Sequence, residues 1–167
     1  MHQTPLQLAV EQIAFARGYT LRLIDATDPA DWFRMPGGVT HLAWQVGHLA
    51  MAEYRLCLER VRGVRPEDAA LIAPDFIRLF RRETTPDPEP GKYPSPAEIR
   101  AVLDRIHVQT LRELSTLDEA ILEKPVEDPH WIAKTRLWCL LWCSHHETLH
   151  AGQIGLLRRQ LRRPPLW

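Results

Sequence analysis

The sequence has few cysteines, no excess of charge of either sign and no long apolar run. Its three cysteines, Cys57, Cys139 and Cys143, are an odd and sparse set among 167 residues. They favour reduced thiols in a cytoplasmic protein over a disulfide framework. Lys and Arg together number 21, as do Asp and Glu. Without an overall basic field to hold nucleic acid, a small-molecule partner is the expectation.

Membrane and export signals are also missing from the sequence. The longest apolar run, LWCLLWC at 137–143, is far shorter than the roughly 20 residues that span a bilayer. The first 20 residues lack a basic stretch followed by an unbroken apolar core, and carry Glu11 and Gln12 where that core would lie. We therefore expect neither a membrane span nor an export signal.

What the sequence does contain is helical periodicity. Apolar residues recur at helical spacing in four long stretches, and no stretch alternates with the period of a strand. The predicted long helices cover 6–26, about 40–61, 96–117 and 135–161, and a weaker segment at 67–82 predicts a short helix. The chain is therefore predicted to be all-α.

The connections between these helices include two long loops. Prolines at 86, 88, 90, 94 and 96 exclude a helix from 84–95, and a second loop covers 118–134. Ser95, Pro96 and Glu98 have the order of a capping box, which predicts the start of the third long helix. Four helices joined partly by long loops indicate a four-helix bundle, with residues 1–167 forming one domain.

The last predicted helix contains HETLH at 146–150, the H-E-x-x-H pattern of zinc proteases. Those enzymes take a third ligand from downstream, but AGQIGLLRRQLRRPPLW after His150 contains no His, Asp, Glu or Cys. His146 and His150 nevertheless share one helix face and can bind one ion. That face also carries apolar or weakly polar residues at core spacing, namely Cys139, Cys143, Gln153 and Leu157. Two buried histidines satisfied by hydrogen bonds are the alternative.

A third histidine, His48, lies within the apolar helix predicted at 40–61. Gly47 precedes it and would permit a close approach of a neighbouring group or ligand. A lone core imidazole is usually satisfied by hydrogen bonds. Together with the inward-facing pair on another helix, His48 instead favours a site of three histidines.

These motifs resemble the DinB-like or YfiT-like four-helix-bundle family of metalloenzymes. The matching segments are Trp44 and GHLA at 47–50, then HETLHAGQI at 146–154 and LRR at 157–159. The resemblance covers essentially the whole chain. It implies a divalent metal bound by His48, His146 and His150, with the other coordination positions left to water or substrate.

The donor types narrow the choice of metal. Neutral imidazoles suit zinc or nickel, with iron or manganese also considered, and three protein ligands with an open position are typical of catalytic sites. Such a metal lowers the pKa of a bound water or thiol. The better-understood members that the chain resembles are transferases or isomerases that use a low-molecular-weight thiol such as bacillithiol or mycothiol, and family members are often dimeric.

Several other residues are candidates for the site. Glu147 lies about 100° from the ligand face and either reaches the site as a catalytic base or faces solvent. Arg55 is a candidate to bind a substrate carboxylate, and Trp44 and Gln153 are further candidates for substrate contact. His41 and His107 are either a fourth ligand, hydrogen-bonding partners of the ligands or boundary residues. Cys139 and Cys143 are interpreted as core packing, and His145 as facing away.

The sequence thus predicts a metal-dependent enzyme in which three histidines activate a thiol or water. The favoured reaction is thiol-dependent S-transfer to a small electrophile. A metal-dependent hydrolase and a non-catalytic, dimeric metal- or ligand-binding bundle are the alternatives.

Overall fold

Long helices dominate the computed structural model, which describes residues 2–128 and 131–166. The four longest helical stretches are α1 (Pro5–Asp25), α2 (Leu42–Glu53) with its continuation to Arg62, α6 (Pro96–Leu114) and α7 (Arg136–Gln160). Within the described residues there is no strand, only an isolated bridge between Pro125 and Thr135. The prediction of an all-α bundle is confirmed.

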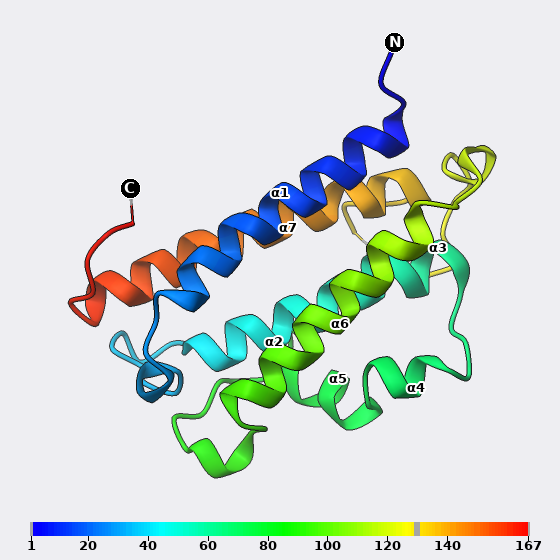
Figure 1. Cartoon of the computed structure of the whole chain (residues 1–167). Coiled ribbons are helices and arrows are strands. Elements are labelled where there is room, and N and C mark those ends of the chain that lie inside the picture. The colour runs from blue at the N-terminus through cyan, green and yellow to red at the C-terminus, as the bar shows by residue number, and fades with distance from the viewer. Residues whose placement is uncertain (1, 129–130, 167) are drawn as a thin grey trace.

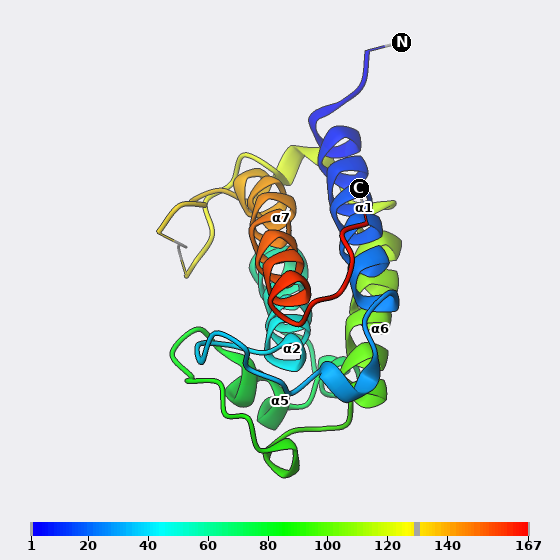
Figure 2. The same cartoon turned by 90° about the vertical axis from the view of Figure 1, so that its left-hand side faces the viewer.

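The four long helices occupy the corners of a bundle (Figures 1 and 2). α1 packs along α7, and α2 packs along α6. In the end-on view of Figure 2, α7 lies over α2 and α1 lies over α6, and both pairs are in contact. Side chains on α2 and α7, including the predicted metal-binding histidines, can therefore meet on one side of the bundle.

The helix starts follow their capping residues. The Thr4 hydroxyl accepts from the Gln7 amide and the Gln7 side chain accepts from the Thr4 amide, which makes a capping box at α1. Ser95 and Glu98 form the second capping box, as predicted, although α6 ends at Leu114, earlier than 117. Thr135 caps α7 by accepting from the Trp138 amide.

The second long helix contains an irregularity that its sequence pattern does not reveal. After α2, the chain takes a π-helical turn at Tyr54–Glu59 and then the short α3 (Arg60–Arg62). π-Helical turns inside α-helices occur frequently at functional sites. This turn carries Arg55, one of the predicted substrate contacts.

The short helix predicted at 67–82 is in fact two. α4 (Asp68–Leu71) and α5 (Pro74–Phe80) are separated at Ile72 and Ala73. Pro74 explains the break, because it has no amide hydrogen to donate and restricts the residue before it to an extended backbone. α5 packs against α2.

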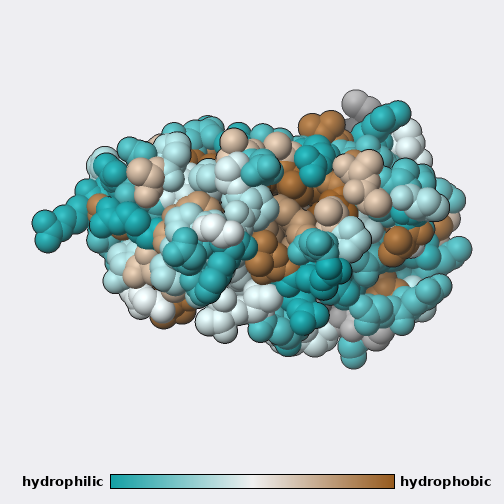
Figure 3. Space-filling model, turned by 90° about the horizontal axis from the view of Figure 1, so that it is seen from below, coloured by the Kyte–Doolittle hydropathy of each residue, from teal (hydrophilic) through white to brown (hydrophobic). Residues whose placement is uncertain are grey.

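The connections contain three further short helical turns, Pro29–Asp31, Pro90–Lys92 and Glu119–Ile121. Seen from below, the molecule carries hydrophobic residues in small patches among hydrophilic ones (Figure 3). Across the described parts of the chain, we find no helix with the length and apolar character required to cross a bilayer.

Candidate metal centre

Three histidine side chains from α2 and α7 converge on one point. The Nε2 atoms of His48 and His146 lie 3.3 Å apart, and those of His150 and His146 lie 3.2 Å apart. Each residue offers one ring nitrogen, and these atoms all lie within 4.8 Å of one another. The two motifs that were singled out in the sequence, 98 residues apart, are thus brought together.

Hydrogen bonds at the other ring nitrogens orient two of the three imidazoles. His48 Nδ1 is 2.8 Å from the Phe80 carbonyl oxygen, and His150 Nδ1 is 2.5 Å from Gln45 Oε1. The Gln45 amide nitrogen donates to Thr40, which leaves Oε1 as the acceptor toward His150. Because carbonyl oxygens only accept, both Nδ1 atoms carry the proton and both Nε2 atoms present a lone pair.

Burial keeps the rings of His48 and His150 neutral. His48 is 5% exposed and His150 is 9% exposed. Burial lowers the pKa of His48, and burial together with the neighbouring His146 and His48 lowers the pKa of His150 to about 2. Neutral imidazole is the form that binds transition metals.

Two of the three spacings between the ring nitrogens, those that involve His146, fit a metal ion. Zinc bound to imidazole at about 2.0–2.1 Å in tetrahedral geometry places neighbouring nitrogens about 3.3–3.4 Å apart. The observed separations of 3.3 Å and 3.2 Å agree with this value. Since His48 and His150 both present lone pairs, the single Nε2 of His146 could serve both only by sharing one N–H, whereas a metal ion accepts all three nitrogens. The three histidines are therefore able to hold a metal ion.

The floor of the site is built by a close contact between α2 and α5. A Cβ atom added to Gly47 would overlap the ring of Phe80, so only glycine permits this approach. The same Phe80 supplies the carbonyl that orients His48. The close approach predicted for Gly47 is thus made by a neighbouring side chain.

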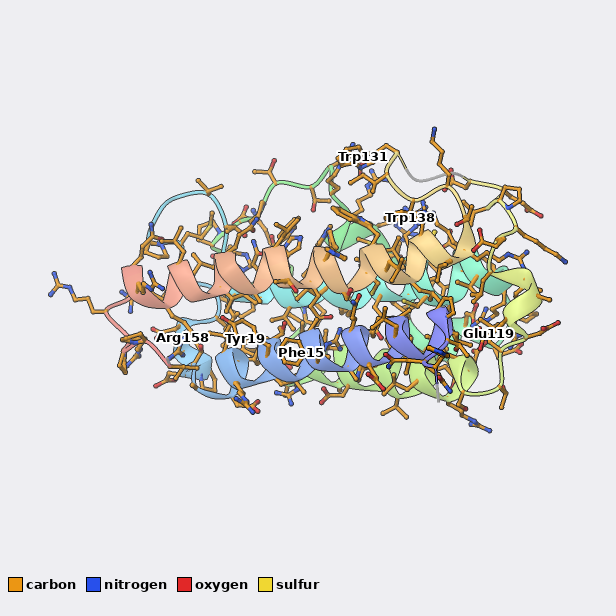
Figure 4. The ribbon with its side chains drawn as sticks, turned by 90° about the horizontal axis from the view of Figure 1, so that it is seen from above. Phe15, Tyr19, Glu119, Trp131, Trp138 and Arg158 are labelled. Carbon is orange, nitrogen blue, oxygen red and sulfur yellow. The ribbon has the colours of Figure 1, made fainter. Side chains whose placement is uncertain are left out.

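A cavity of about 260 Å³ lies over His48 and His146. Its walls come from the π-helical turn, from the 81–83 segment and from α7 with the loop before it. It is lined by Met51, Ala52, Arg55, Leu56, Arg60, Arg81, Arg82, Glu83, Trp131 and Trp142. Figure 4 shows Trp131 beside α7, on the side away from α1. A larger, shallow hollow of about 600 Å³ between α1 and α7 contains none of the three histidines.

A sequence model of the DinB superfamily matches residues 12–154. The match covers most of the chain and includes all three histidines. The chain belongs to the DinB superfamily. The family assignment predicted from the motifs is confirmed. A comparison with curated proteins finds no match.

In this DinB-superfamily chain, the predicted substrate contacts have three different placements. Arg55 lines the cavity. Trp44 stacks on His48 with ring centroids 4.8 Å apart and an interplanar angle of 13°, and its indole nitrogen donates to Thr84. Gln153 is exposed and does not line the cavity. Trp44 thus supports the His48 ring, and of these three residues Arg55 alone lines the cavity.

Glu147 neither reaches the site nor faces solvent. The residue is 2% exposed, and its carboxylate accepts two hydrogen bonds from Arg17. It is not among the groups that lie within 4.8 Å of one another at the candidate site. We assign it an ion-pairing role inside the bundle, and its use as a catalytic base finds no support in this arrangement.

The remaining candidates also lie outside the group of three. His41 caps α2 by accepting from the Trp44 amide, and His107 bonds to Glu53. His145 is exposed and bonds to the Leu141 carbonyl, so it faces away as expected. Cys139 and Cys143 are buried in the core, where burial raises the pKa of Cys139 to about 11. A thiol in that protonated state is a poor ligand.

Two residues that help to build the site were missed from the sequence, Phe80 and Gln45. Phe80 lies in a weakly periodic segment and acts through its backbone, which no side-chain pattern reveals. Gln45 did leave a signal, because it lies three residues before His48 and on the same side of a helix. A polar residue at that spacing in an apolar helix is a candidate partner for a histidine ligand.

Proposed function

We propose that this chain is a metal-dependent enzyme whose ion is bound by His48, His146 and His150. The observation that supports this most strongly is the convergence of three Nε2 atoms, two of them with oriented lone pairs, where His48 and His146 line an open cavity. A purely structural histidine cluster would have no need of a cavity above it. Proteins of the superfamily also often bind metals.

The bound ion supplies Lewis acidity, which lowers the pKa of a coordinated water or thiol. We propose zinc or nickel, with iron or manganese as alternatives, because the donors are three neutral imidazoles. The chain itself contributes the orientation of the rings. Phe80 and Gln45 hold the protons on Nδ1, and Trp44 keeps the plane of His48 fixed by stacking.

The proposed reaction is the transfer of a low-molecular-weight thiol to a small electrophile. This choice comes from the resemblance to thiol-dependent members of the family, and the buried, protonated cysteines favour a thiol brought from outside. Hydrolysis by a metal-activated water uses the same site. In either reaction the 260 Å³ cavity limits the substrate to a small molecule.

The test begins with metal content measured by elemental analysis on untagged protein. We expect about one ion per chain in the wild type and its loss in His48→Ala. His145→Ala is the matched control, because His145 is exposed and on the same helix as two proposed ligands. If the wild type stays empty after supply of zinc, nickel, iron and manganese, the proposed site is wrong.

Turnover then separates the three candidate functions. The loaded enzyme is assayed with a panel of thiols and electrophiles, and again without thiol. Metal-dependent turnover that requires a thiol supports S-transfer, and metal-dependent turnover without thiol supports hydrolysis. A loaded protein with no metal-dependent turnover across the panel supports the non-catalytic binding module.

Homodimerisation stays a prediction. Large apolar side chains are exposed along α1 and α7, namely Leu8, Phe15, Trp138, Leu149 and Leu156, and Figure 4 views this side. Phe15 is 77% exposed. If the chain dimerises through this side, Phe15→Asp lowers the sedimentation coefficient to that of a monomer, whereas the wild type sediments as a dimer at micromolar concentration.

A further inference from the structure

The cavity above the three histidines is strongly basic, although the chain as a whole is neutral. Four arginines line it, Arg55, Arg60, Arg81 and Arg82, together with one carboxylate, Glu83. They come from two separate parts of the chain, the α2–α3 region and the segment that follows α5. This concentration of guanidinium groups is not explained by the metal site, because a divalent cation would be repelled by them.

The four arginines differ in how closely carboxylates of the protein pair with them. Arg60 is 10% exposed and committed to Asp128, with contacts of 3.1 Å to its carbonyl and 3.0 Å to its carboxylate. Among the residues that the structure describes, Arg55 makes only long ion pairs, 3.5 Å to Glu59 and 3.6 Å to Asp128. Its guanidinium is therefore only weakly satisfied by its neighbours.

The two arginines after α5 have even weaker ion pairs within the protein. Arg82 lies 4.0 Å from Glu83, and both side chains are mostly exposed. The Arg81 side chain takes part in no ion pair within the described residues. Since exposed pairs at such distances contribute little, Arg55, Arg81 and Arg82 remain available to a ligand.

Two tryptophans, Trp131 and Trp142, also line the cavity. The rings of Trp131 and Trp142 meet edge to face with centroids 6.4 Å apart. The Trp142 ring centroid lies 6.1 Å from that of His146, so this aromatic part of the lining reaches a candidate metal ligand. Such a lining binds the apolar body of a ligand.

We propose that the cavity selects small organic anions, molecules with a carboxylate or phosphate group on an apolar body. The oxyanion lies against Arg55, Arg81 and Arg82, and the body packs on Trp131 and Trp142. The other end of the molecule then points at the three histidines. That orientation toward the histidines would make the anion the substrate or cosubstrate, and it alone rests on the proposed function. Binding of the anion to the arginines and tryptophans does not depend on it.

The test uses protein stripped of metal with EDTA, so that anion binding is measured independently of the ion. The probes are benzoate, phenyl phosphate and the neutral benzamide, titrated calorimetrically at low salt. We expect benzoate or phenyl phosphate to bind at least about tenfold more tightly than benzamide, since guanidinium bonds to an oxyanion are charge-assisted. The tighter of the two identifies the oxyanion.

Substitutions assign the effect to the cavity. Arg55→Gln and Arg81→Gln each weaken binding of the preferred anion about five- to tenfold and leave benzamide unchanged. Glu83→Gln strengthens anion binding, because it removes the one carboxylate among the lining residues. Arg112→Gln is the matched control, an exposed arginine on α6 that does not line the cavity.

Equal binding of benzoate, phenyl phosphate and benzamide overturns the inference. So does an equal loss in Arg112→Gln, which would reduce the effect to overall charge. The outcome is distinct from that of the metal assay. If the chain binds no metal but prefers the anions, this inference stands and the proposed enzymatic function is wrong. If the chain binds metal but shows no preference for the anions, the proposed metal site stands and this inference is wrong.

Discussion

Arg17 and Glu147, 130 residues apart in the chain, are joined by two hydrogen bonds at the centre of the bundle. Arg17 Nε donates to Oε1 at 2.7 Å, and Nη2 donates to Oε2 at 3.1 Å. Nη2 also donates to Glu53 at 2.7 Å, and Nη1 donates to the Leu103 carbonyl at 3.1 Å. One guanidinium thus connects α1 to α2, α6 and α7.

This network sits beside the candidate metal centre and fixes the helices that carry it. Glu147 lies between His146 and His150 in the sequence but on another side of α7. Glu53 follows His48 on α2 and also bonds to His107. Although burial alone would raise it, the pKa of Glu53 is held below its usual range by Arg17 and His107. Both carboxylates therefore depend on Arg17.

Replacing Arg17 should be strongly destabilising. Arg17→Met leaves Glu53 and Glu147 buried without their cation, and breaking a buried ion pair in this way costs about 3–5 kcal/mol. The free energy of unfolding is measured by urea denaturation. Arg22→Met, at an exposed position of α1, is the control and should change it by less than about 0.5 kcal/mol. Similar losses in both variants would show that the network contributes little.

The same network separates a structural Glu147 from a catalytic one. Glu147→Gln retains a side chain of the same shape, so we expect about one metal ion per chain and an unchanged pH profile of any metal-dependent turnover. The loss should appear in the urea midpoint instead. A shifted or flattened acidic limb of the pH profile would restore Glu147 as a catalytic base.

Gly47 should not tolerate a methyl group. A Cβ there would overlap the Phe80 ring, and overpacking of this kind costs about 1–3 kcal/mol. Because Phe80 also orients His48, Gly47→Ala should weaken metal binding as well. Gly152→Ala is the matched control, since nothing lies within 4 Å of the added atom on an exposed part of α7. It should stabilise the protein by roughly 0.5–1 kcal/mol. Gains in both variants would contradict the close contact.

Gln45 should tune metal affinity without touching the ion. Its Oε1 atom accepts from His150 Nδ1, and loss of such a partner typically reduces affinity about 10–100-fold. We expect this loss in Gln45→Leu, measured by competition with a metal-binding dye. Gln109→Leu, which removes a glutamine from α6 that bonds to Glu113, should leave the affinity unchanged. Equal affinities in wild type and Gln45→Leu would mean that His150 needs no orienting partner.

Particular residues show how much of the fold and of the candidate site could be predicted from the sequence. Ser95 and Glu98 predicted a helix start because capping is local, and the spacing of His146 and His150 fixed a shared face before any tertiary contact was known. The position of Glu147 was not predictable, because 100° of helix rotation says nothing about which helix packs there. The partners of His48 and Gly47 were also hidden, since Phe80 belongs to a short helix whose docking on α2 is a tertiary event.

His41 should make stability depend on pH. It is buried, its Nδ1 accepts from the Trp44 amide, and burial lowers its pKa to about 4. Unfolded His41 titrates near 6.5, so between about pH 6.5 and 4 the unfolded chain binds a proton that the folded chain does not. Stability therefore falls as the pH falls through this window, by about 1.4 kcal/mol per pH unit once well below 6.5.

His41→Asn isolates this contribution, because asparagine is a favoured N-cap residue and does not titrate. Urea unfolding of metal-free protein at pH 8 should give similar free energies for wild type and variant. At pH 5 the wild type should have lost about 1–2 kcal/mol more than the variant, and the remaining slope belongs to groups such as His48 and His150, whose pKa values are also lowered by burial. Parallel pH profiles for the two proteins would show that folding does not lower the pKa of His41.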